Sequence, residues 1–329
     1  MEIFDTGNAS LHSWWGEMLG PGLAFDTSKY FIVCANILGS CYGSTSPTSP
    51  DPNNPTNEPY LYSFPDISVR DTVRLQLHML KNDLNIHSVK SVIGGSFGGM
   101  QTLEFALLAG SVNSEFITKG DGKTTLDKPF IRTNIPIACG AAHTAWQIAI
   151  SETQRQAIYA DPKWNNGNID MNDPPLAGLE VARQIGMVSY RTAKGYEEKF
   201  GRSRQKDSNA LYGSKAKWQV KSYLEYQGQK FLSRFDPVTY VKLTEQMDTH
   251  DVGRNRGGKV KALSKIDVPT LVLGIDSDVL YPLHEQVELA HLIPNAQMNI
   301  IRSDAGHDGF LLEQEQVGNH IINFLNEYD

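Results

Sequence analysis

The stretch Gly94-Gly95-Ser96-Phe97-Gly98 follows an apolar run at 89–93 and precedes a helix-like run at 100–109. Gly-x-Ser-x-Gly between a strand and a helix is typical of a nucleophile elbow, a turn so tight that the Ser hydroxyl stands clear of the sheet. Gly94 and Gly98 should be small because neighbouring backbone passes close to both. The motif alone arises by chance in many chains, so its meaning depends on its partners: an acid after a later strand and a His later still.

Both partners follow the elbow in the required order. Thr270–Ile275 is short, apolar and preceded by a proline, which predicts a buried strand, and Asp276 and Asp278 come directly after it. A second short strand at 298–301 leads into His307, which lies in a Gly-flanked loop. Strand, elbow and helix, followed by an acid and a His, predict a Ser-Asp-His catalytic triad with the elbow serine as nucleophile.

Composition excludes several classes of protein. The chain has 329 residues, 40% of them hydrophobic, and a formal net charge of −7. No basic cluster suggests nucleic-acid binding, no apolar run is long enough to cross a membrane, and no metal-ligand spacing is present. The beginning of the chain does not resemble a signal peptide. Three cysteines without a CxxC pair predict buried thiols in a reducing cytoplasm: Cys34, Cys41 and Cys139.

Strands alternating with helices predict a mostly parallel sheet flanked by helices on both faces. The expected strands of the first half are 30–38, 89–95 and 134–139. A helix should begin after Ser68, with Asp71 as its capping-box partner.

The middle of the chain has helical patterns and no convincing strand. Segments 176–200 and 217–235 predict long amphipathic helices. We therefore expect a core in two parts, 1–143 and 254–329, interrupted by a helical insertion at 144–253. The insertion could be a packing appendage, but its place between nucleophile and acid favours a lid that excludes water from the site.

Several longer motifs are spread along the chain. They are Trp14-Trp15-Gly16-x-x-Leu19-Gly20-Pro21-Gly22, Phe25-Asp26-Thr27, Asn36-x-Leu38-Gly39-Ser40-x-Tyr42-Gly43-Ser44, Gly94-Gly95-Ser96-x-Gly98-Gly99-Met100-Gln101, Gln154-Arg155-Gln156-Ala157-Ile158 and Gly306-His307-Asp308. With them the chain resembles the homoserine O-acetyltransferase family of the α/β-hydrolase superfamily over essentially its whole length. Related fungal enzymes that acetylate serine or deacetylcephalosporin C look similar. The resemblance implies an α/β-hydrolase fold with a helical lid.

The resemblance also assigns the triad. Ser96 matches the family nucleophile and His307 the base. Asp278 matches the acid, because Ser277-Asp278-Val279-Leu280 fits the family pattern Ser-Asp-x-Leu better than Asp276 does. The backbone amide of Phe97, the residue after the nucleophile, should supply one donor of the oxyanion hole.

Three further residues match acceptor-binding positions of the family. Arg183 matches the arginine that holds the acceptor carboxylate, a task suited to its planar two-donor fork. Asp308 matches the acidic residue that meets the acceptor ammonium, and Tyr190 a tyrosine that points into the site. Without the resemblance, Arg183 would be read as a solvated helix residue and Asp308 as a helix cap.

The implied reaction is a two-step acyl transfer. Ser96 takes an acetyl group from acetyl-CoA, and the hydroxyl of L-homoserine then accepts it, a step of methionine biosynthesis. The implied enzyme is cytoplasmic, uses acetyl-CoA as a co-substrate with no bound cofactor, and forms a homodimer through the lid. Two alternatives stay open: a serine O-acetyltransferase of the same family, and an esterase that shares the triad but needs no facing Arg183 and Asp308.

The beginning of the chain departs from the family pattern. Family members carry an apolar strand and a His-Ala-Leu-like stretch ahead of the Thr-Gly that here is Thr6-Gly7, and Asp5 stands where they have the second oxyanion donor. About fifty residues and the first strands of the usual sheet are expected to be missing. A truncated gene model, a shortened natural sheet and an inactive chain would each explain this, and the intact later motifs favour the first.

Overall fold

The computed structural model describes residues 14–114, 116–118, 127–205 and 218–328. Its centre is a sheet of four parallel strands in the order β1-β4-β5-β6. The strands are β1 (Val92–Gly95), β4 (Asn134–Ile137), β5 (Thr270–Ile275) and β6 (Ala296–Ile301). The parallel sheet expected from the alternation of strands and helices is confirmed.

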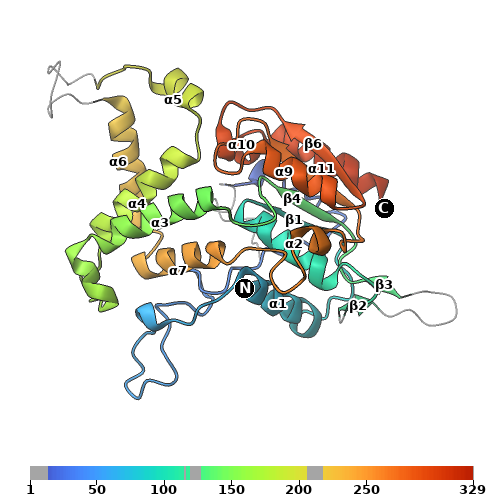
Figure 1. The fold of residues 1–329 in the computed structure, drawn as a ribbon, viewed down its shortest axis with the longest axis horizontal. Helices are drawn as coiled ribbons and strands as arrows, with labels where there is room; N and C mark the ends of the chain where they lie inside the picture. Colours follow the sequence, from blue (N-terminus) through green and yellow to red (C-terminus); the bar gives the residue numbers. More distant parts are fainter. Residues whose placement is uncertain (1–13, 115, 119–126, 206–217, 329) are drawn as a thin grey trace.

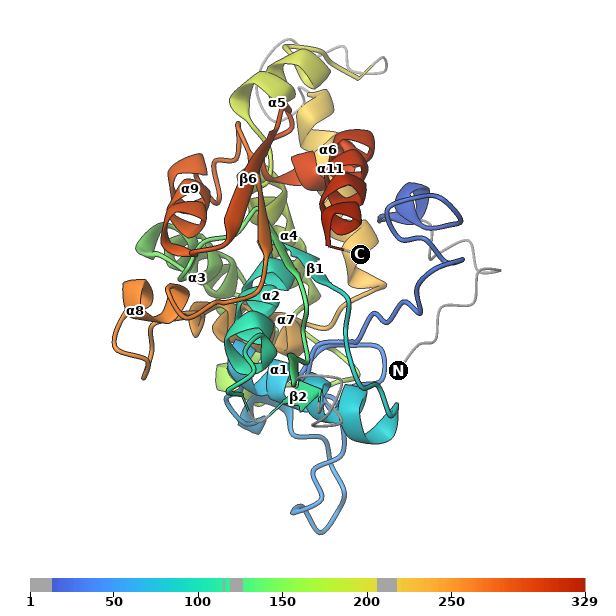
Figure 2. The same cartoon turned by 90° about the vertical axis from the view of Figure 1, so that its right-hand side faces the viewer.

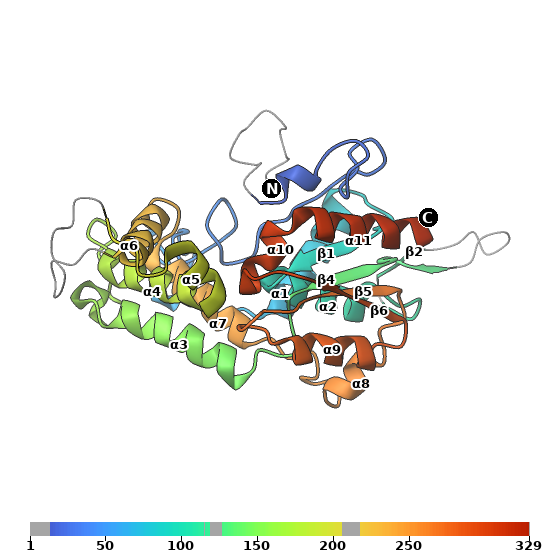
Figure 3. The same cartoon turned by 90° about the horizontal axis from the view of Figure 1, so that it is seen from above.

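Helices cover both faces of the sheet (Figures 2 and 3). On one face, Leu271 and Leu273 of β5 pack against α11 (Gln314–Glu327). On the other face, Val272 packs with α2 (Phe97–Ala109), α8 (Lys259–Leu263) and α9 (Leu283–Leu292). This alternation follows from the two-residue period of a strand. The covering helices are α1 (Val69–His78), α2 (Phe97–Ala109), α8 (Lys259–Leu263), α9 (Leu283–Leu292), α10 (Gly309–Leu312) and α11 (Gln314–Glu327).

A group of helices lies at one end of the sheet, on the left of Figure 1. It comprises α3 (Ala145–Tyr159), α4 (Leu176–Ser189), α5 (Ala193–Phe200), α6 (Gln219–Leu232) and α7 (Pro237–Asp248). Its own core includes Ile158, Leu179 and Val241, all fully buried. The chain enters and leaves this group through two paired segments, because Ala142 and Asp251 form an antiparallel bridge. We call these helices the lid.

Short elements complete the described structure. They are the 3-10 turns η2 (Gly16–Met18), η3 (Leu61–Ser63), η5 (Pro162–Gly167) and η6 (Gly306–Asp308), the π turn η4 (Met79–Asp83), and a small hairpin of β2 (Ile117–Thr118) and β3 (Lys128–Pro129). The predicted capping box is confirmed, since Ser68 and Asp71 hydrogen-bond each other's backbone at the start of α1. Among the described residues, no helix is long and apolar enough to span a membrane.

Two expectations about elements and one about a cysteine were wrong. Residues 30–37 have no regular secondary structure, because this segment pairs with none of the described strands. Phe31 is accordingly 77% exposed, and Cys34 is exposed rather than buried. The helix expected over 176–200 is broken between Ser189 and Ala193.

Candidate active site

Three loops meet at the carboxyl edge of the sheet. Because the strands are parallel and in register, the segments that follow β1, β5 and β6 emerge side by side. These segments carry Ser96, Asp278 and His307. Ligand sites of open α/β sheets lie at this edge.

Ser96 stands in the strained turn between β1 and α2. Its backbone has φ 55° and ψ −118°, a conformation that costs a non-glycine residue about 1–3 kcal/mol. A Cβ at Gly94 would lie 2.5 Å from the backbone of Gly98, so position 94 must be glycine. Gly98 differs from the expectation: a Cβ there would meet no heavy atom within 4 Å. The crowding at this turn therefore falls on Gly94 and not on Gly98.

The triad geometry is complete. His307 Nε2 lies 2.8 Å from Ser96 Oγ, and His307 Nδ1 lies 2.7 Å from Asp278 Oδ2. The other carboxylate oxygen of Asp278 accepts hydrogen bonds from the backbone amides of Leu280 and Tyr281, at 2.9 and 2.8 Å. A carboxylate fixed in this way holds Nδ1–H, which leaves Nε2 to accept the serine proton.

Asp276, the alternative candidate for the triad acid, contacts other residues instead of His307. Its carboxylate accepts from the backbone amide of Ser303 at 3.0 Å and pairs with Arg302 at 3.2 Å, so it links the ends of β5 and β6. Asp278 is the aspartate that contacts His307.

The surroundings of His307 tune its basicity. Burial disfavours its charged form, but the charge and hydrogen bond of Asp278 outweigh this and raise the pKa of His307 above its ordinary value. The rings of Tyr190, Tyr281 and Phe310 pack around the imidazole, with centroids 5.3–6.0 Å away. The base is therefore buried, oriented and predisposed to take a proton.

The oxyanion donor expected from Phe97 lies at the first residue of α2. The first amides of a helix have no intrahelical acceptor, and the helix dipole favours negative charge there. The second donor was expected near Asp5, which lies outside the described residues.

The lid brings Arg183 and Tyr190 toward the triad. The guanidinium carbon of Arg183, on α4, lies 4.7 Å from the ring centre of Phe231 and 5.8 Å from that of Tyr190. Tyr190 in turn contacts His307, as noted above, and its backbone carbonyl accepts from the amide of Asp308 at 3.3 Å. Both residues therefore lie on the site side of the lid.

Asp308 has a partner that sequence analysis missed. Its Oδ2 lies 2.8 Å from Nε of Arg191, in the turn between α4 and α5. Burial raises the pKa of the Asp308 carboxyl, against the opposing charges of Arg191, His307 and Arg183. In the sequence, Arg191 is only an arginine next to Tyr190 in a segment expected to be one continuous helix, so no pattern indicated this contact.

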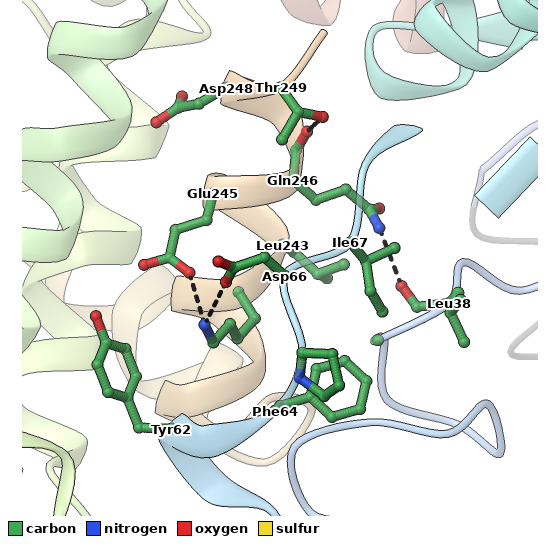
Figure 4. Close-up of a pocket in the computed structure, with 13 residues that line it drawn as sticks. Leu38, Tyr62, Phe64, Asp66, Ile67, Leu243, Glu245, Gln246, Asp248 and Thr249 are labelled. Carbon is green, nitrogen blue, oxygen red and sulfur yellow. Dashed lines mark hydrogen bonds and ion pairs between the residues drawn. The ribbon is translucent and has the colours of Figure 1, made fainter. Parts of the chain in front are cut away.

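A surface pocket of about 550 Å³ lies between α7 and the segment around 38–67 (Figure 4). None of the triad residues lines it. Its lining lysine, Lys242, is 3.1 Å from both Asp66 and Glu245, so its charge is balanced within the pocket. The pocket is thus separate from the candidate active site.

Comparison with known proteins agrees with this geometry. The family model described as "alpha/beta hydrolase fold" matches residues 3–314. Homoserine O-acetyltransferase from Salinibacter ruber is 45% identical over 94% of this chain and 81% of the relative, and that from Nostoc punctiforme is 45% identical over 98% and 84%.

Solved structures match at lower identity. Homoserine O-acetyltransferase from Bacillus anthracis superposes with a TM-score of 0.80 at 21% identity, over 95% of this chain and 81% of that one. Esterase E22 superposes with a TM-score of 0.79 at 21% identity, over 94% and 82%. These solved structures share the fold of this chain, and the sequence relatives identify its family. The chain is an acyltransferase with an α/β-hydrolase fold and belongs to the homoserine O-acetyltransferase family.

Proposed function

We propose that this protein transfers an acetyl group from acetyl-CoA to the hydroxyl of L-homoserine through an acetyl-Ser96 intermediate. The observation that carries the proposal is the Ser96–His307–Asp278 hydrogen-bonded triad beneath a lid whose polar residues suit an amino-acid acceptor. The family relatives named as homoserine O-acetyltransferases support the same acceptor.

In the first half-reaction, His307 takes the Ser96 proton while Oγ attacks the thioester carbonyl. The amide of Phe97 stabilises the developing oxyanion, and Asp278 stabilises the imidazolium. Collapse of the tetrahedral intermediate breaks the carbon–sulfur bond and releases CoA, with the proton returned from His307 to the sulfur. Acetyl-Ser96 remains.

In the second half-reaction, L-homoserine binds under the lid. Arg183 holds its carboxylate and Asp308 its ammonium, with Tyr190 as part of the wall. The acceptor hydroxyl gives its proton to His307 and attacks the acetyl carbon, and Ser96 leaves with that proton. Holding the hydroxyl in line is what makes it compete with water.

The cellular setting is proposed on the same basis. The reaction belongs to methionine biosynthesis in the cytoplasm, with acetyl-CoA as co-substrate and no bound cofactor.

A homodimer through the lid is supported by apolar side chains on its outer surface: Val181 and Val188, seven residues apart on α4, are 48% and 54% exposed.

The test is steady-state release of CoA from acetyl-CoA, followed with a thiol reagent. We expect continuous release only with L-homoserine and parallel double-reciprocal lines, the pattern of a ping-pong scheme. L-Serine is the rival acceptor, and its preference would favour the serine O-acetyltransferase alternative. Cleavage of a simple acetyl ester without homoserine-dependent CoA release would instead favour an esterase.

A further inference from the structure

The turn between α4 and α5 is docked on the loop that carries the catalytic histidine. Thr192 Oγ1 donates to the carbonyl of Asp304 at 2.6 Å, and the amide of Asp308 donates to the carbonyl of Tyr190. Gly306 has φ +70°, and a Cβ there would lie 2.9 Å from the Tyr190 carbonyl oxygen. The two backbones thus touch where Arg191 faces Asp308.

The pair formed there is half-buried. Arg191 and Asp308 side chains are 25% and 15% exposed, and Nε lies 2.8 Å from Oδ2. Burial favours the neutral form of the Asp308 carboxyl, whereas the positive charge of Arg191 favours its ionised form. The short Nε–Oδ2 separation holds the Asp308 carboxylate beside a cation of the lid turn.

We propose that Arg191 is a positioning residue for the acceptor half-reaction: it holds the Asp308 carboxylate in place to receive the acceptor's ammonium group. The proposal rests on the proposed function, since it needs an amino-acid acceptor. It makes Arg191 a determinant of specificity for α-amino acceptors, acting through Asp308 and touching neither Ser96 nor the acetyl group.

A simpler role for the Arg191–Asp308 pair is that of a clamp, which only attaches the lid turn to the loop that carries His307. The chain supplies a matched control for it. Lys194 and Asp304 form a 2.6 Å ion pair between the same two segments, with side chains 61% and 56% exposed. If the pairs served only as clamps, breaking either one should lower the rates with both acceptors. A loss of ammonium recognition should follow only from breaking the Arg191 pair.

The experiment compares two acceptors in wild type, Arg191→Gln, Arg191→Lys and Lys194→Gln. One acceptor is L-homoserine and the other is 4-hydroxybutyrate, which has a hydrogen in place of the amino group. For Arg191→Gln we expect kcat/KM for L-homoserine to fall about 10- to 100-fold, the range for a lost charge-assisted contact. For the same variant, kcat/KM for 4-hydroxybutyrate and the rate of acetyl-enzyme formation should stay within about twofold of the wild-type values, because neither step involves an ammonium group.

Arg191→Lys should restore part of the loss, since it keeps the charge without the fork. Lys194→Gln should resemble wild type with both acceptors. The double variant Arg191→Gln, Asp308→Asn should be no worse than Asp308→Asn alone, because the two residues act as one unit.

Equal losses with both acceptors, or the same loss in Lys194→Gln, would overturn the proposal in favour of the clamp. Additive losses in the double variant would also overturn it. Failure of the proposed function looks different: wild type itself would then release no CoA on addition of L-homoserine.

Discussion

Asp278 and Asp276 lie two residues apart in the sequence, yet only Asp278 contacts His307. Replacing Asp278 with Asn should lower kcat/KM by about 10³- to 10⁴-fold, because the amide favours the wrong imidazole tautomer. Asp276→Asn should reduce kcat/KM much less, since that carboxylate contacts Ser303 and Arg302. Steady-state CoA release measures both variants, and similar losses in the two would contradict the assignment.

The pH dependence of acylation follows from the same pair. Neutral His307 is the base, so activity falls as pH drops through its pKa, and Asp278 raises that pKa. The acid limb of the kcat/KM profile for acetyl-CoA should therefore lie above the ordinary pKa of histidine. In Asp278→Asn the limb should move to lower pH, because the stabilising negative charge is gone. A limb that stays in place would contradict this account.

Arg183 tests the acceptor site independently of acylation. Arg183→Ala should raise KM for L-homoserine by at least about tenfold, because the acceptor carboxylate loses a charged partner. The rate of acetyl-enzyme formation should change little, since Arg183 packs on Phe231 and Tyr190 rather than on the triad. Rapid-quench measurement separates acetylation of the enzyme from transfer to L-homoserine. An equal loss of rate in both steps would contradict a role for Arg183 in the acceptor site.

The residues of the site differ in how far sequence could predict them. Ser96 and His307 stand in short local motifs, which hydrogen bonding brings together in the structure. The choice of Asp278 over Asp276 rests on a family pattern, and Asp278 is the aspartate that lies beside His307. Arg191 could not be found in this way. Its meaning depends on the contact between a lid turn and a loop more than a hundred residues away, which no local pattern encodes.

At the scale of elements, the elbow depends on the close approach of β1 and α2. Gly94→Ala should destabilise the fold by about 1–3 kcal/mol or more, because its Cβ would meet the backbone of Gly98 at 2.5 Å. Gly98→Ala is the matched control and should leave the free energy of unfolding unchanged or raised, since it adds a better helix former in open space. Urea unfolding compares the two. Equal stabilities would show that the elbow tolerates a side chain at Gly94.

Elements with strong local signals were predicted well, and those that depend on neighbours were not. The strand Thr270–Ile275 has the predicted bounds, because a short apolar run after Pro269 is buried on both faces. The apolar segment at 30–38 carries the same kind of signal, but a strand needs a paired neighbour, and this segment joins no described strand. The break at Tyr190 is likewise a tertiary effect, since this turn docks on the histidine loop.

At the scale of the whole molecule, a single substitution that introduces a charge tests the proposed dimer through the lid. Val181→Asp should weaken the dimer by at least about tenfold, because an unpaired carboxylate would be buried in the interface. Val260→Asp is the control: Val260 is 58% exposed on α8, which Figure 3 places away from the lid. Sedimentation velocity over a range of concentrations reports both. A monomeric wild type, or an unchanged Val181→Asp dimer, would contradict the proposed interface.

The central claim is that Ser96 carries the acetyl group between two substrates. The most direct measurement is the intact mass of the protein after mixing with acetyl-CoA alone, for wild type and Ser96→Ala, followed by addition of L-homoserine. We predict one added acetyl group on wild type, none on Ser96→Ala, and loss of the group as O-acetyl-L-homoserine forms. An acetyl group that appears equally on Ser96→Ala, or that L-homoserine does not remove, would contradict the account.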